Sequence, residues 1–67
     1  MTELSELLMS LAIRDMLDSS EEVSRVSVLS RLNRLMLTEW DENRCYAYVM
    51  AIRELQNDLN ITLLTDN

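Results

Sequence analysis

Apolar residues recur at the three- and four-residue spacing of amphipathic helices in three successive segments of this chain. The segments cover about residues 3–17, 20–37 and 41–60. The third is the most regular, and its apolar stripe comprises Cys45, Tyr48, Val49, Ile52, Leu55 and Leu59. A short polar turn around Trp40 separates the second and third segments, which is typical of an antiparallel helical hairpin. We therefore predict an all-α fold, in which a short N-terminal helix precedes an antiparallel two-helix hairpin.

The composition supports this fold class. The chain has 67 residues, which is one small domain, and it contains neither glycine nor proline. Tight β-hairpin turns depend on glycine, so its absence argues against a β fold. Leucine, methionine, glutamate and arginine are abundant instead, and all of them favour helices.

Capping residues indicate where the three helices begin. Thr2 is the predicted N-cap of the first helix. Ser19 with Glu22, or Asp18 with Glu21, forms a capping box that starts the second helix near residue 20, although a continuous helix through this point remains an alternative. The third helix is capped by either Thr38 or Asp41.

The first helix has a wider apolar arc than one packed face requires. Leu4, Leu8 and Leu11 share one side, whereas Met9, Ile13 and Met16 lie toward another. Either both flanks are buried in the chain's own core, or one flank is kept for another chain. A core this small is only marginally stable alone, so we expect a partner or dimerisation to complete the bundle.

Residues with catalytic or ligand-binding chemistry are scarce. The chain has no histidine and a single cysteine, Cys45, which excludes an internal disulfide, histidine-based catalysis and the usual zinc sites. No glycine-rich phosphate loop is present. We therefore expect no enzyme activity, no cofactor, no metal ion and no small-molecule substrate, and we interpret Cys45 as a small apolar residue.

The net charge of −6 narrows the possible partners. Binding to nucleic acid requires many cationic side chains, so we do not expect it here. A basic protein is a better electrostatic match, and a merely soluble acidic surface is the alternative. Arg25, Arg31 and Arg34 make the second helix basic, either as a docking strip or for pairing with acidic residues of neighbouring helices. No apolar run is long enough to span a membrane and no signal peptide is apparent, so we expect a cytoplasmic protein.

The candidate interface residues lie on the first and third helices and at the turn. They are Leu8, Leu11, Tyr48, Val49 and Ile52, with Trp40 at the edge. Two interpretations of Trp40 are open. Its ring can cover the end of the core while its N–H meets water, or it can be a binding anchor, since tryptophan is enriched at interface hot spots.

Three stretches of the chain resemble the small E-component chaperones of type III secretion needles. They are the start Met1-Thr2-Glu3-Leu4, the run Arg31-Leu32-Asn33-Arg34-Leu35-Met36, and the segment from Asp41 to Tyr46 that leads into Ile52, Leu55 and Leu59. Members of that family are short helical hairpins that pair with a second chaperone and hold the needle subunit monomeric in the bacterial cytosol. Residues 28–37 and the turn after them also resemble small acidic regulators of biofilm formation and acid resistance.

We therefore expect a non-enzymatic helical module that binds another protein, in the leading interpretation a co-chaperone of a secretion assembly. The alternative is a small acidic regulator or inhibitor, of phage, plasmid or stress origin, that binds a host protein or mimics the charge of nucleic acid. High salt separates them, because an apolar interface survives it and an acidic one weakens. A homodimeric helical bundle is a third possibility.

Overall fold

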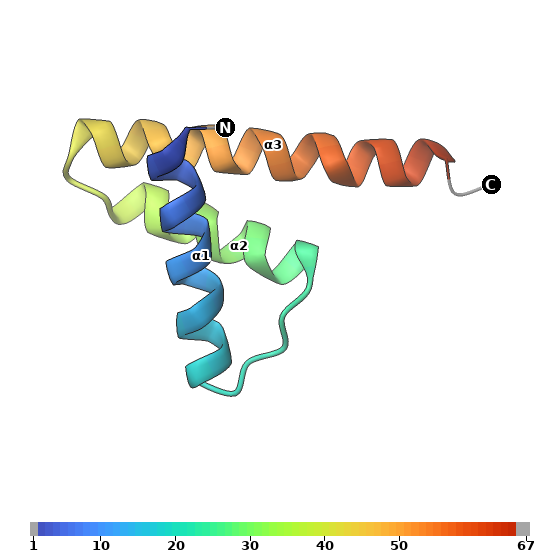
Figure 1. Cartoon of the computed structure of the whole chain (residues 1–67), viewed down its shortest axis with the longest axis horizontal. Helices are drawn as coiled ribbons and strands as arrows, with labels where there is room; N and C mark the ends of the chain where they lie inside the picture. The colour runs from blue at the N-terminus through green and yellow to red at the C-terminus, as the bar shows by residue number, and fades with distance from the viewer. Residues whose placement is uncertain (1, 66–67) are drawn as a thin grey trace.

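The computed structural model describes the backbone of residues 2–65 and the side chains of residues 2–59. Within that part of the chain it contains three α-helices and no strand: α1 covers Glu3–Asp18, α2 covers Arg25–Thr38 and α3 covers Glu42–Thr65 (Figure 1). The predicted all-α class is therefore confirmed. The second helix begins later than the expected residue 20, and the third continues beyond the expected residue 60.

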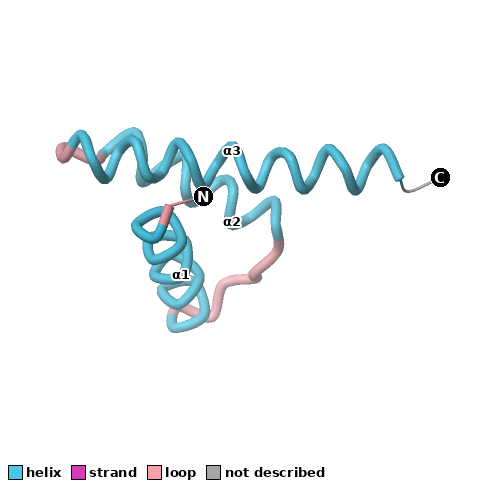
Figure 2. Tube along the Cα trace, turned by 45° about the horizontal axis from the view of Figure 1, so that its top comes forward, coloured by secondary structure: helices cyan, strands magenta, loops and turns pink. Residues whose placement is uncertain are grey.

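The helices form a hairpin with one helix laid across it. α2 and α3 run in opposite directions on either side of the turn at residues 39–41, as the sequence predicts (Figure 1). α1 packs against both of them and crosses the N-terminal half of α3 steeply. The C-terminal part of α3 runs on past the other two helices in both views of the chain (Figure 2).

The core lies where the three helices meet. Its buried apolar side chains among the described residues are Leu8, Ala12, Met16, Val28, Leu32, Ala47, Tyr48, Ala51, Ile52 and Leu55. Leu32 of α2 and Ala51 of α3 are 0% exposed, so water reaches neither side chain. Burial of this apolar surface is the main force that holds the helices together.

The buried face of α3 is rotated from the predicted stripe. Ala47 and Ala51, which the helical spacing puts at the borders of the stripe, are fully buried, whereas Cys45 and Val49 are only half-buried. The short side chain of alanine allows a neighbouring helix to approach closely, and α3 packs against both α1 and α2. A pattern based on side-chain hydrophobicity undervalues such positions.

A left-handed residue, Ser20, separates α1 from α2. Its φ is 57°, and it follows the C-cap residue Ser19. The Ser20 N–H donates to the carbonyl oxygen of Leu17 at 3.1 Å, and the Glu21 N–H donates to that of Met16 at 2.9 Å. These two bonds form a Schellman motif, which terminates a helix by satisfying its last carbonyl groups. The alternative of one continuous helix is therefore wrong.

The helix caps agree with the sequence at α1 and differ at α2. The Thr2 hydroxyl accepts a hydrogen bond from the Ser5 N–H at 3.1 Å, which confirms Thr2 as the N-cap of α1. The capping box of α2 joins Ser24 and Ser27, each of whose hydroxyls accepts from the other's N–H. The predicted boxes at Ser19 or Asp18 are wrong, because the Schellman motif and a non-helical link occupy residues 19–24.

Replacing Ser20 with glycine is expected to stabilise the fold by about 0.5–1 kcal/mol, because glycine adopts a positive φ without steric cost. Thermal unfolding followed by circular dichroism should show a melting temperature raised by about 2–8 °C. Ser30→Gly is the matched control, since Ser30 is exposed within α2 and glycine inside a helix destabilises it. A Ser20→Gly variant that melts below the wild type would contradict this account of the turn.

Candidate docking surface

The structure separates the six predicted interface residues into core and surface. Leu8, Tyr48 and Ile52 are buried in the core of this chain, because they lie on the helix faces that meet there. Val49 is half-buried. Of the six, only Leu11 and Trp40 are exposed: Leu11 shows 47% of its surface to solvent and Trp40 shows 98%.

The most exposed apolar side chains gather at the turn between α2 and α3. We call residues Leu37, Thr38, Glu39 and Trp40 the hairpin tip; together they line an open hollow of about 460 Å³. Leu37, in the last turn of α2, is 79% exposed. Trp40 is 98% exposed, so its indole packs against almost none of the protein. The interpretation in which the indole covers the end of the core is therefore wrong.

Hydrogen bonds hold the backbone of this tip in place. The Glu39 carboxylate accepts from the N–H groups of Trp40 at 3.1 Å and Asp41 at 3.3 Å, and from Nε of Arg44 at 2.9 Å. The Asp41 carboxylate accepts from the N–H groups of Asn43 and Arg44, which caps α3. Of the two caps that the sequence allows, Asp41 is therefore the one used. The exposed indole stands on an ordered turn.

The turn should weaken in acid. The Arg44 guanidinium, together with the Asp41 and Trp40 N–H groups, lowers the pKa of the Glu39 carboxyl below its ordinary value of 4.5. A lowered folded-state pKa means that the ionised carboxylate favours the folded protein. Its stabilisation is complete above 4.5 and is lost as the pH falls through the lower folded-state pKa.

Thermal melts of the wild type and Glu39→Gln between about pH 7 and pH 3 test this, because the window brackets the ordinary carboxyl pKa. We expect the variant to melt lower at pH 7, and the difference from the wild type to shrink toward pH 3. Glu54→Gln, on the exposed side of α3, is the matched control. A difference between wild type and Glu39→Gln that stays constant with pH would contradict the assignment.

A second exposed apolar strip lies on α1. Leu7 and Leu11 are one helical turn apart and each is about half exposed. Leu11 also lines a hollow of about 180 Å³ between the helices, whose other lining residues are Leu8, Ala12, Asp15, Leu35, Arg44 and Tyr48. Three predicted interface residues, Leu8, Leu11 and Tyr48, thus meet at one place.

Arg44 connects this hollow to the hairpin tip. It lines the hollow and pairs with Glu39 of the tip. Its pKa is raised, first by the Glu39 carboxylate and then by the Tyr48 hydroxyl. We call Leu37 and Trp40, the two exposed apolar residues of the tip, the docking surface. Sequence reasoning did not select Leu7 and Leu37, and the only signal for Leu37 was its place off the main stripe of the second helix.

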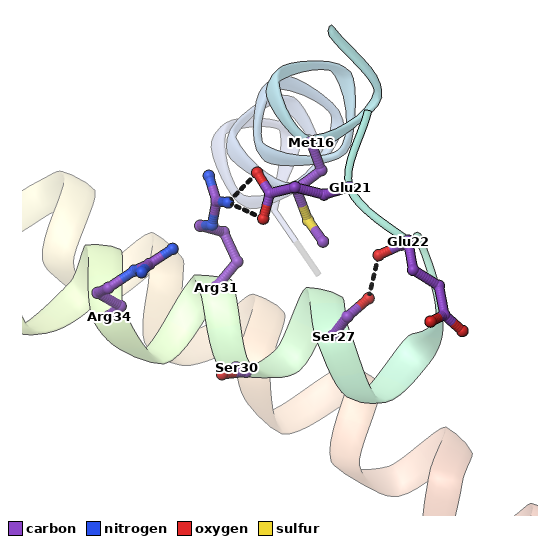
Figure 3. Close-up of a pocket in the computed structure, with 7 residues that line it drawn as sticks. All are labelled: Met16, Glu21, Glu22, Ser27, Ser30, Arg31 and Arg34. Atoms are coloured by element: carbon purple, nitrogen blue, oxygen red, sulfur yellow. Dashed lines mark hydrogen bonds and ion pairs between the residues drawn. The ribbon is translucent and has the colours of Figure 1, made fainter. Parts of the chain in front are cut away.

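Arg31, one of the three basic residues of α2, pairs with acidic residues of its own chain. Arg31 donates to the Asp15 carboxylate of α1 at 2.8 Å and pairs with both carboxylate oxygens of Glu21 in the α1–α2 link. Figure 3 shows Arg31 pointing toward Glu21, beside a polar hollow of about 420 Å³. Intramolecular pairing, one of the two alternatives for the arginines, is therefore confirmed for Arg31.

The described part of the chain contains neither a cluster of metal-binding side chains nor a membrane-spanning helix. No group of three or more histidine, cysteine, aspartate or glutamate side chains there is arranged to hold a metal ion. None of the helices, over the same residues, combines the length and apolar character that crossing a membrane requires.

Comparison with known proteins identifies no relative of this chain. No protein-family model, no curated protein and no solved structure matches the chain. The resemblance to the E-component chaperones stays a prediction.

Proposed function

We propose that this chain is a non-enzymatic helical module that binds another protein through the docking surface. The observation that supports this most directly is Trp40, which is 98% exposed at the hairpin tip beside the 79% exposed Leu37. Large apolar side chains exposed together are unfavourable in water and are typical of surfaces that bind a partner. Tryptophan is also enriched among the residues that dominate binding energy.

The order of the turn adds to this argument. Glu39 and Asp41 bind the backbone around Trp40, so the indole's attachment point is fixed before any partner arrives. A preorganised anchor loses less conformational entropy on binding than a flexible one. A turn whose only task is to connect two helices has no need for an exposed indole.

The co-chaperone role is the narrower form of this proposal. It rests on the resemblance at residues 1–4, 31–36 and 41–46, and it specifies a helical chaperone of a secretion assembly as the partner. In that form, the docking surface binds the partner chaperone, and the pair then holds the secreted subunit.

Site-specific photocrosslinking in the producing cell tests the proposal. A photoreactive phenylalanine analogue at position 40 should give one dominant product with another protein, which mass spectrometry identifies. The same analogue at Arg53, exposed on α3, is the matched control and should not give that product. The proposal fails if both positions yield the same products or if position 40 yields none. A product of two copies of this chain would show the homodimer instead.

A further inference from the structure

Most of the large exposed apolar side chains lie on segments of the chain with more acidic than basic residues. Five of the eight large exposed apolar residues lie on α1 or the hairpin tip: Leu7, Leu11, Leu17, Leu37 and Trp40. α1 carries four acidic residues against one arginine, and residues 38–44 carry three against one. α2, whose last turn contributes Leu37 to the tip, has three arginines and no acidic residue, and its exposed Arg34 lies one helical turn before Leu37.

Two acidic side chains that follow the docking surface in sequence are available to a partner. Asp41 comes directly after Trp40, and Glu42 begins α3 beside the tip. Both are exposed, and neither forms an ion pair within the described part of the chain. The surface therefore joins apolar contact area to unneutralised negative charge.

We propose, building on the protein-binding function above, that the partner presents a basic amphipathic helix to this surface. Its apolar face would contact Leu37 and Trp40, and its flanking lysine or arginine side chains would meet Asp41 and Glu42. Amphipathic helices commonly bind in apolar grooves in this way, and charge complementarity steers the encounter and selects the partner. Nucleic acid and anionic membranes carry the wrong charge for this surface.

Trp40 is the only tryptophan, so its fluorescence reports directly on the tip. The probe is a synthetic helical peptide of leucine and lysine without aromatic residues, and its control replaces every lysine with glutamate. We expect the basic peptide to shift Trp40 emission to shorter wavelength, by an amount that saturates as the peptide concentration rises. Higher salt should weaken the binding of the peptide. The acidic peptide should leave the emission unchanged.

Variants locate the contact. Glu42→Gln should weaken binding of the basic peptide about two- to fivefold, as expected for loss of one exposed charge pair. Glu54→Gln removes the same charge about 18 Å further along α3 and should change nothing. Leu37→Ser should also weaken binding, whereas Val26→Ser, at another exposed apolar position, should not.

Three results would overturn this inference: no shift with the basic peptide, an equal shift with both peptides, or a shift with phosphatidylglycerol vesicles in place of the peptide. These failures are separable from failure of the protein-binding function. If position 40 gives a specific crosslink but the basic peptide leaves Trp40 emission unchanged, only the inference that the partner is a basic helix is wrong. Absence of any specific crosslink at position 40 removes the function itself.

Discussion

Replacing Leu32 with alanine is expected to destabilise the protein by about 2–5 kcal/mol, the usual cost of truncating a fully buried leucine. Leu32 is 0% exposed and belongs to the core where α2 meets the other helices. A domain of this size has little stability in reserve, so a loss of this magnitude is expected to leave much of the chain unfolded at room temperature. Urea denaturation followed by far-ultraviolet circular dichroism measures the loss.

Leu37→Ala provides the control for that measurement. This variant makes the same leucine-to-alanine change in the last turn of α2, where the side chain is 79% exposed. The free energy of unfolding should therefore change by less than about 0.5 kcal/mol. If the two variants unfold at the same urea concentration, the orientation of α2 described here is wrong.

Replacing Trp40 with alanine should have the largest effect on binding and almost none on folding. A tryptophan at the centre of an interface commonly contributes about 2 kcal/mol or more, which is about a thirtyfold loss of affinity. Because Trp40 is 98% exposed in the free chain, its removal leaves no cavity in the core. Calorimetric titration of each variant with the partner protein that crosslinking at position 40 identifies measures the affinity. Thermal melts measure the stability.

Leu17→Ala serves as the binding control, because Leu17 is a large apolar residue with 61% exposure but lies at the C-terminal end of α1, outside the docking surface. It should retain wild-type affinity. Unchanged affinity in Trp40→Ala would remove the hairpin tip from the interface, and a large fall in melting temperature would show that the indole supports the fold.

The periodicity of apolar residues was sufficient for the helices and their hairpin, because an amphipathic helix needs its stripe wherever it packs. It could not locate the start of α2. Both capping boxes that the sequence indicates, Ser19 with Glu22 and Asp18 with Glu21, place it near residue 20. The box that forms, Ser24 with Ser27, lacks the usual glutamate or glutamine at its third helical position, and the left-handed break at Ser20 carries no glycine to reveal it.

The candidate site was harder to predict for a related reason. Leu8, Tyr48 and Ile52 have the same spacing whether their stripe faces the chain's own core or another protein, so the sequence alone could not separate these uses. Three-dimensional packing assigns them to the core. Trp40 differs because it stands in a polar turn outside every stripe, which is why its exposure could at least be considered from the sequence.

The direction of α3 has a practical consequence for handling the protein. The helix starts beside the hairpin tip at Glu42 and ends at Thr65, so its 24 residues extend over about 36 Å. A biotin, fluorophore or affinity handle attached after Thr65 would therefore leave the molecule at the end opposite Trp40. Immobilisation through that end should orient every copy with its tip toward the solution, whereas attachment through the turn would block it.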